Sequence, residues 1–146
     1  MRILMVCLGN ICRSPMAQGI MEKLVKDRGL DWVIDSAGTN GMHNGESPDK
    51  RAIEEARNRG IDISQQRSRK IRKSDLEYFD IIFSMDNRVL KECFKVFGDR
   101  SDKNIKCIMS FVNSNEEVED PYYDGSFKKA FDKIEAGCHA MISQFS

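Results

Sequence analysis

The junction at residues 6–15 constrains the fold most strongly. A short apolar run from Ile3 to Val6 leads into Cys-Leu-Gly-Asn-Ile-Cys-Arg-Ser, and a helical pattern begins at Pro15. A strand that runs through a glycine-bearing loop into a helix is typical of an anion site, because loop N–H groups and the helix N-terminus converge on one point. Cys7 opens the loop and Arg13 closes it. The sequence therefore predicts a thiolate and a guanidinium facing one phosphate-like anion.

Strand and helix patterns alternate along the rest of the chain. Strands are predicted at residues 2–7, 32–36, 79–85 and 105–109, and helices at 15–28, 48–60, 86–98 and from 126 onward, with Ser14, Ser47 and Asp86 as N-caps. This alternation implies an α/β fold with a parallel sheet and helices on both faces. Right-handed crossovers and a ligand loop after the first strand favour a doubly wound, flavodoxin-like order. The site then lies at the carboxyl ends of the strands, where the first and third would meet.

Three segments without periodicity connect these elements. Residues 38–47 contain three glycines and are predicted to form a loop, and residues 111–125 form a long acidic loop. Residues 61–73 are basic and irregular. We interpret them as a solvated surface, with a docking role as the alternative.

Composition narrows the class of protein. A length of 146 residues fits one domain, 1–146, and a formal net charge of zero indicates neither a nucleic-acid nor a membrane partner. No apolar run approaches the ~20 residues of a membrane span. The N-terminus has no signal-peptide layout, so we expect a cytoplasmic protein with its five cysteines reduced. The cysteines form no CxxC pair, so neither a metal site nor a cofactor is expected.

Two motifs near opposite ends of the chain resemble a known family. Residues 7–17, Cys-Leu-Gly-Asn-Ile-Cys-Arg-Ser-Pro-Met-Ala, are similar to the signature of the low-molecular-weight protein tyrosine phosphatases. Asp120-Pro121-Tyr122-Tyr123 resembles that family's general-acid loop, and residues 35–39 and 47–49 also match. The resemblance covers nearly the whole chain. It implies the family's four-stranded fold and the hydrolysis of phosphotyrosine in protein substrates. We also expect a monomer.

The resemblance and the chemistry together assign the catalytic roles. Cys7 is the expected nucleophile, since the loop, Arg13 and the helix N-terminus all favour its thiolate form. Arg13 would hold two phosphoryl oxygens, and residues Leu8, Gly9, Asn10, Ile11, Cys12, Arg13 and Ser14 would bind the phosphate. Asp120 is the expected general acid for the leaving phenolate. From the residues alone, its acidic surroundings favour a surface carboxylate over a catalytic acid.

Further residues are assigned to support and to substrate. Asn10 and Ser14 could hold the loop by side-chain bonds, and in the family Ser36 joins them. The substrate slot would be formed by Met42, His43, Tyr122 and Tyr123, although the tyrosines could also simply pack against the last helix. Cys12 is either a small packing residue or a partner that captures oxidised Cys7 as a reversible disulfide.

The chain departs from the family at two positions. Met42 stands where many relatives have an aromatic residue lining the slot, which leaves substrate preference open. Gln65 stands at the expected site of a histidine that joins the network around the loop. Glutamine can form hydrogen bonds there but cannot titrate.

Three other functions are alternatives to phosphotyrosine hydrolysis. An arsenate reductase on the same fold needs two further thiols that are close to each other in the sequence. Cys93 and Cys107 are too far apart in the sequence for this role. Phosphoarginine phosphatases tend to carry threonine where this loop has Ile11, which favours phosphotyrosine. A phosphate-binding module without catalysis would not need Cys7, Arg13 and Asp120 together.

Overall fold

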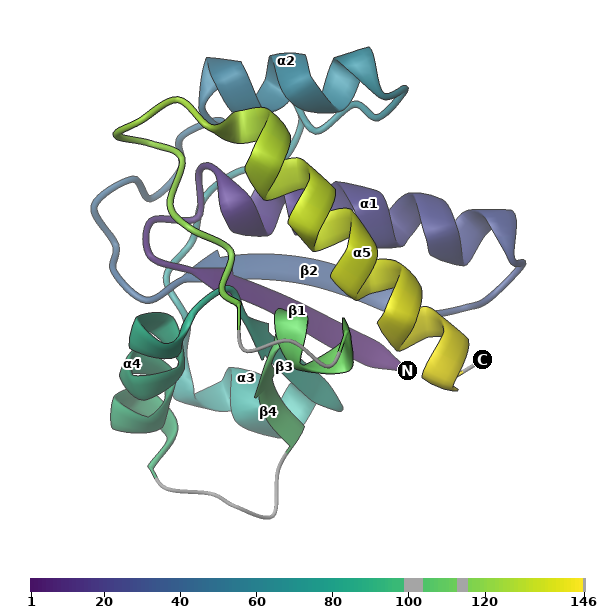
Figure 1. Cartoon of the computed structure of the whole chain (residues 1–146). Coiled ribbons are helices and arrows are strands. Elements are labelled where there is room, and N and C mark those ends of the chain that lie inside the picture. The colour runs from purple at the N-terminus through teal and green to yellow at the C-terminus, as the bar shows by residue number, and fades with distance from the viewer. Residues whose placement is uncertain (99–103, 113–115, 146) are drawn as a thin grey trace.

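The computed structural model describes residues 1–98, 104–112 and 116–145, and these contain one parallel sheet (Figure 1). Its strands are β1 (Arg2–Cys7), β2 (Val33–Gly38), β3 (Ile81–Ser84) and β4 (Asn104–Cys107), in the order β2-β1-β3-β4. Strand β1 is central and pairs with β2 on one side and β3 on the other. The predicted parallel α/β sheet, with the first and third strands adjacent, is confirmed.

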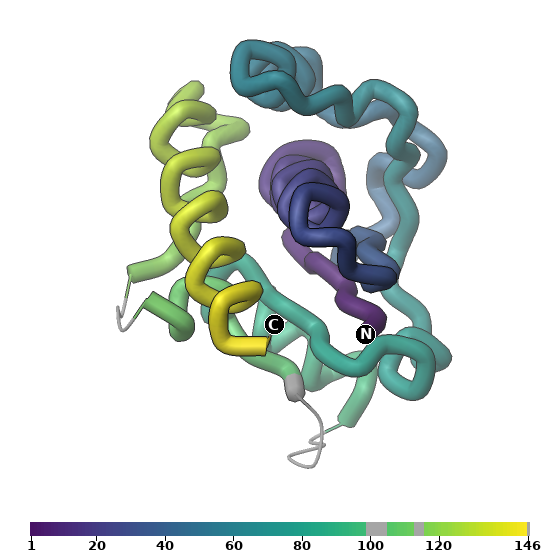
Figure 2. Tube along the Cα trace, turned by 90° about the vertical axis from the view of Figure 1, so that its right-hand side faces the viewer, coloured from purple at the N-terminus to yellow at the C-terminus, as the bar shows by residue number. Residues whose placement is uncertain are grey.

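Helices cover both faces of the sheet. One face carries α1 (Arg13–Asp27), α2 (Lys50–Asn58) and α5 (Phe127–Phe145), and the other carries α3 (Lys73–Tyr78) and α4 (Asn87–Phe97), as Figure 1 shows. A 3₁₀ helix, η1 (Ile108–Val112), follows β4. Figure 2 shows α1 enclosed by α2, α5 and the sheet. No helix among the described residues is long and apolar enough to cross a membrane.

The side chains of strand β1 explain why helices must cover both faces of the sheet. Ile3, Met5 and Cys7 belong to the core under α1 and α5, whereas Leu4 and Val6 belong to the core under α3 and α4. Alternate side chains of a strand point to opposite faces, so a strand that is apolar throughout must be covered on both sides. The buried apolar run thus places the carboxyl end of β1, and with it Cys7, at the sheet's centre.

Several local predictions need correction. Helix α1 begins at Arg13, so Ser14 lies inside the helix and is not its N-cap. Helix α2 is capped by Asp49, whose Oδ1 accepts a hydrogen bond from the Arg51 N–H at 2.8 Å, and not by Ser47. Asp86 does cap α4, as predicted.

The connectors also differ in detail. The segment predicted as irregular over 61–73 runs into a short unpredicted helix, α3, whose Leu76 is buried. The strand predicted to reach Met109 ends at Cys107, and η1 occupies the start of the predicted acidic loop. Residues 113–115 of that loop lie outside the described residues.

Candidate active site

Residues 7–13 form a tight loop between β1 and α1, called the anion loop below. Its carbonyl groups bond outward to surrounding donors: Cys7 to the Thr39 N–H at 3.0 Å, Leu8 to the Asn40 N–H at 3.1 Å, Gly9 to Ser68 Oγ at 3.0 Å, Ile11 to the Asp49 N–H at 2.7 Å and Cys12 to the Met16 N–H at 3.3 Å. In a trans peptide the N–H points away from the carbonyl. Outward carbonyls therefore turn the following N–H groups inward, toward a common centre.

Two backbone features allow this curvature. Asn10 has a φ of 57°, a left-handed conformation that asparagine tolerates better than most residues. Gly38, at the end of β2, lies directly against the loop, where a Cβ atom would be 2.9 Å from the Leu8 carbonyl oxygen. Only glycine lets β2 approach this closely.

The Asn10 carboxamide organises the buried side of the loop. Its Nδ2 donates to Ser14 Oγ at 2.8 Å and to Ser36 Oγ at 3.0 Å, while its Oδ1 accepts from the Arg69 N–H at 3.0 Å. Both amide hydrogens of Asn10 are thus used on hydroxyl oxygens. The Ser14 hydroxyl has two acceptors in reach, the Ala37 carbonyl at 3.4 Å and Cys7 Sγ at 3.0 Å, and the sulfur is the nearer of the two.

The support network contains residues that the sequence analysis missed. The Ser36 hydroxyl donates to Gln18 Oε1 at 2.7 Å, which extends the network into α1. The prediction for Gln65 is wrong: this residue is exposed and bonds to Ser64. Its neighbour Gln66 instead donates to the Pro15 carbonyl at 3.0 Å, at the start of α1.

Arg13 is buried and held on two sides. Its Nη1 donates to Asp86 Oδ2 at 2.6 Å and to the Val118 carbonyl at 2.8 Å, and its Nη2 lies 3.7 Å from Asp120 Oδ2. Only 3% of the Arg13 side chain is exposed. Asp86 therefore has a second function besides capping α4, because it fixes the guanidinium that faces the anion loop. Neither the residue type of Asp86 nor its position as a helix cap predicts this contact with Arg13.

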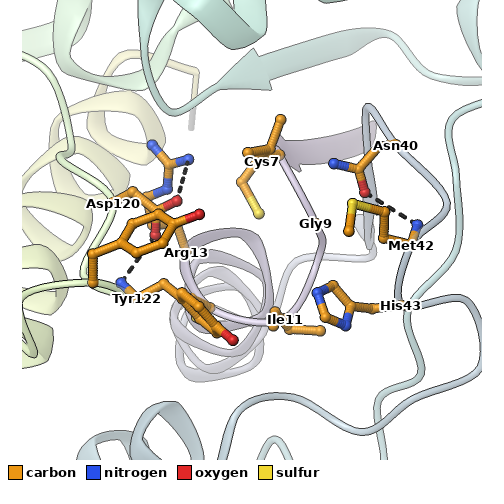
Figure 3. A pocket seen from close by; sticks show the side chains of 12 residues that line it. Cys7, Gly9, Ile11, Arg13, Asn40, Met42, His43, Asp120 and Tyr122 are labelled. Carbon is orange, nitrogen blue, oxygen red and sulfur yellow. Dashed lines mark hydrogen bonds and ion pairs between the residues drawn. The ribbon is translucent and has the colours of Figure 1, made fainter.

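The predicted catalytic and slot residues lie around one pocket (Figure 3). Its lining comprises Cys7, Leu8, Gly9, Ile11, Cys12, Arg13, Asn40, Met42, His43, Asp120, Tyr122 and Tyr123. Asp120 stands across the pocket from the loop, and its Oδ1 accepts from the Tyr122 N–H at 3.0 Å. Met42 and Tyr123 are 80% and 85% exposed, so they lie at the pocket mouth.

His43, one of the predicted slot residues, packs directly on the anion loop. A Cβ added at Gly9 would lie 3.1 Å from His43 Cδ2, so the ring covers the glycine backbone. Its Nδ1 lies 2.6 Å from Glu46 Oε2, which fixes the orientation of the ring. The glycine at position 9 therefore also makes room for this wall of the pocket.

The second cysteine of the loop differs from the first. Burial raises the pKa of the Cys12 thiol, so Cys12 stays neutral at physiological pH. A neutral, buried thiol is a poor nucleophile, so Cys12 does not compete with Cys7 for that assignment. Among residues 1–98, 104–112 and 116–145, no group of three or more His, Cys, Asp or Glu side chains could hold a metal ion.

Comparisons with known proteins agree with this architecture. The family model of the low molecular weight phosphotyrosine protein phosphatases matches residues 2–146. Low molecular weight protein-tyrosine-phosphatase YfkJ of Bacillus subtilis is 36% identical over 97% of this chain and 93% of its own length. The crystal structure of YfkJ superposes with a TM-score of 0.94 at 35% identity, covering 99% of this chain and 93% of that one.

Two solved arginine phosphatases are also similar. The Drosophila arginine phosphatase DARP has a TM-score of 0.93 at 32% identity, covering 100% of this chain and 98% of that chain. A cysteine-to-serine variant of YwlE arginine phosphatase, with a phosphorylated active-site serine, has a TM-score of 0.89 at 26% identity, covering 99% and 95%. The fold, the full-length family match and the shared identity lead to one conclusion: this chain is a hydrolase of the low molecular weight phosphotyrosine protein phosphatase family.

Proposed function

We propose that the enzyme hydrolyses phosphotyrosine in proteins, and small aryl phosphates, through a phosphocysteine at Cys7, with Asp120 as the general acid. The observation that carries this proposal is the arrangement across one pocket. Cys7 lies in a ring of inward N–H groups, Arg13 is anchored beside it, and Asp120 faces both. This arrangement supports the proposal, because a phosphate held in the loop would have a nucleophile, a guanidinium and a carboxyl group around it.

In the first step the Cys7 thiolate attacks phosphorus, and the bond from phosphorus to the phenolic oxygen breaks. The electron pair of that bond goes to the oxygen, and Asp120 supplies its proton. The loop N–H groups and Arg13 hold the equatorial oxygens of the transition state. The phosphorylated serine in the YwlE variant supports this step, because there the active-site side chain carries the phosphoryl group.

In the second step water attacks the phosphocysteine, and the bond from sulfur to phosphorus breaks. The Asp120 carboxylate takes a proton from the water, and inorganic phosphate leaves. The sulfur departs as a thiolate, which the Ser14 hydroxyl at 3.0 Å stabilises. The same hydrogen bond therefore assists the nucleophile at the start and the leaving group at the end.

The walls of the pocket suit an aromatic ring. Ile11, Met42 and Tyr122 present apolar side chains around the entrance to the anion loop. An apolar side chain at position 11 gives no hydrogen bond to a guanidinium, whereas it can pack against a phenyl ring. The arginine phosphatases among the similar structures make the substrate class a question for direct measurement.

The thiols required by an arsenate reductase are poorly placed for a relay. Cys93 is fully buried, and its burial raises its pKa to about 12. Cys107 lines a different hollow, together with Asn87 and Lys106. Cys12 remains the one further thiol in the pocket, and a protective disulfide with Cys7 stays part of the proposal.

The substrate proposal is tested by comparing three peptides of identical flanking sequence that carry phosphotyrosine, phosphoarginine or phosphoserine. We expect kcat/KM for phosphotyrosine to exceed the other two by about 10²-fold, a discrimination that pocket contacts can provide. The Ile11→Thr variant is the control for the role of position 11, and it should narrow the gap to phosphoarginine. Preference of the wild-type enzyme for phosphoarginine would contradict the proposal.

The role of Asp120 is tested with aryl phosphates of graded leaving-group pKa. Asp120→Asn should lower kcat/KM by roughly 10²- to 10³-fold for phenyl phosphate, because this leaving group needs a proton. The loss should be much smaller for p-nitrophenyl phosphate, whose phenolate is already stable. An equal loss across the series would show that Asp120 does not act as the acid.

A further inference from the structure

Arg51, in the first turn of α2, contacts the loop that carries Asp120. Its Nη2 donates to the Tyr122 carbonyl at 3.1 Å. Its Cζ also lies 5.5 Å from the ring centroid of Tyr122 and 4.7 Å from that of Phe127, the first residue of α5. One guanidinium thus holds both the backbone and the side chain of a residue close to the general acid.

The other edge of the guanidinium is fixed to the anion loop. Arg51 Nε and Nη2 bond to the two carboxylate oxygens of Asp49 at 3.1 and 3.0 Å. The Asp49 N–H in turn donates to the Ile11 carbonyl at 2.7 Å, the shortest of the hydrogen bonds given above for the carbonyl groups of the anion loop. A continuous chain of contacts therefore runs from the anion loop through Asp49 and Arg51 to Tyr122.

The chain continues to the carboxyl group of Asp120. The Tyr122 N–H donates to Asp120 Oδ1 at 3.0 Å, while the carbonyl of the same residue is held by Arg51. The hydrogen bonds from Arg51 lower the pKa of Asp49, so this anchor keeps its charge in mildly acidic assays. The Arg51 side chain is 47% exposed, and an ion pair this exposed contributes little to overall stability.

We propose that Arg51 is a positioning residue, which sets the distance between the anion loop and the Asp120 loop so that Asp120 reaches the leaving-group oxygen. The inference rests on the proposed role of Asp120 as general acid. It assigns a function in catalysis to a residue that touches neither the phosphate nor the reacting atoms. Replacing it should impair protonation of the leaving group while leaving the thiolate and the phosphate cradle intact.

The test is the leaving-group dependence of kcat/KM for Arg51→Gln. For phenyl phosphate we expect a loss of roughly 10-fold or more, because misplacement of a catalytic group by a fraction of an ångström has large effects. For p-nitrophenyl phosphate the loss should be about twofold or less, since its departure needs little protonation. Arg51→Lys should resemble Arg51→Gln, because an ammonium group cannot bond to Asp49 and Tyr122 in the fork geometry of a guanidinium.

Arg59→Gln is the matched control. Arg59 lies just beyond the other end of α2. Its Cζ is 4.3 Å from the centroid of the Phe131 ring, and its Nη2 is 2.7 Å from Asp132 Oδ1. It therefore also joins the α2 region to α5 by stacking and an ion pair. In the described part of the chain, its ion pairs reach Glu55, Asp132 and Glu135 and no residue of 120–123. Its substitution should leave the leaving-group dependence unchanged. A change equal to that of Arg51→Gln would mean that general loosening of α2 is the cause and would overturn the inference.

Combining the variants separates failure of this inference from failure of the proposed function. If Arg51 acts through Asp120, adding Arg51→Gln to Asp120→Asn should cause no further loss for phenyl phosphate. If Asp120→Asn steepens the leaving-group dependence and Arg51→Gln does not, Arg51 is not a positioning residue. If Asp120→Asn itself has no such effect, the general acid is misassigned. Additive losses in the double variant would show that Arg51 acts elsewhere.

Discussion

Replacing Cys7 by serine is expected to lower kcat for p-nitrophenyl phosphate by roughly 10⁴-fold or more, the scale seen when a group that acts as part of a catalytic unit is lost. A serine hydroxyl is a much weaker nucleophile than a cysteine side chain at neutral pH. The inward N–H groups and Arg13 would remain in place, so the variant should still bind phosphate-containing ligands. Steady-state kinetics and an equilibrium titration with inorganic phosphate measure the two properties separately.

Cys12→Ser is the matched control for this experiment. Cys12 lines the same pocket, but its buried thiol has a raised pKa and should not serve as the nucleophile. Its substitution should leave most of the activity in place under reducing conditions. Turnover by Cys7→Ser at a tenth of the wild-type rate or faster would contradict the mechanism.

Replacing Arg13 by lysine is expected to reduce kcat by roughly 10³-fold, because the loss of one preorganised oxyanion donor already costs on that order. Lysine keeps the positive charge but lacks the planar fork that can hold two phosphoryl oxygens. It also cannot reproduce the bonds from Arg13 Nη1 to Asp86 and to the Val118 carbonyl. The measurement is kcat with the phosphotyrosine peptide, with circular dichroism to show that the fold is retained.

The Asp86→Asn variant tests how much the negative charge of Asp86 contributes to holding Arg13 in place. Asparagine keeps the size and the helix-capping ability of Asp86, so α4 should persist. The loss of its charge should lower kcat less than Arg13→Lys does.

The prediction for Arg13 itself has a clear contrary outcome. If Arg13→Lys kept more than a tenth of the wild-type kcat, the fork geometry of the guanidinium would not be what stabilises the transition state.

The anion loop could be predicted because it is contiguous in sequence. Cys7, Gly9 and Arg13 lie within seven residues, between a strand and a helix whose patterns are clear. Asp120 lies more than a hundred residues away in an acidic loop, and only the resemblance to a family distinguished it from a surface carboxylate. Its position across the pocket depends on how the chain folds between α4 and α5.

The support around the loop could not be predicted, because it comes from distant segments. The donors to the loop carbonyls include Thr39, Asp49 and Ser68, which no local pattern marks. Ser14 was mistaken for a helix cap, because propensity favours serine there while the bonds to Asn10 and Cys7 hold it inside α1. Tertiary contacts thus override local preference around the site itself.

The most direct test is to locate the phosphoryl group during turnover. The enzyme is mixed with the phosphotyrosine peptide, quenched with denaturant and digested with trypsin, and fragment ions are recorded for peptide 3–13, which contains both Cys7 and Cys12. The mechanism predicts one phosphoryl group on the Cys7 sulfur, formed and lost at rates that match turnover. A phosphoryl group on Cys12 or on any other residue, or full turnover with none on Cys7, would contradict it.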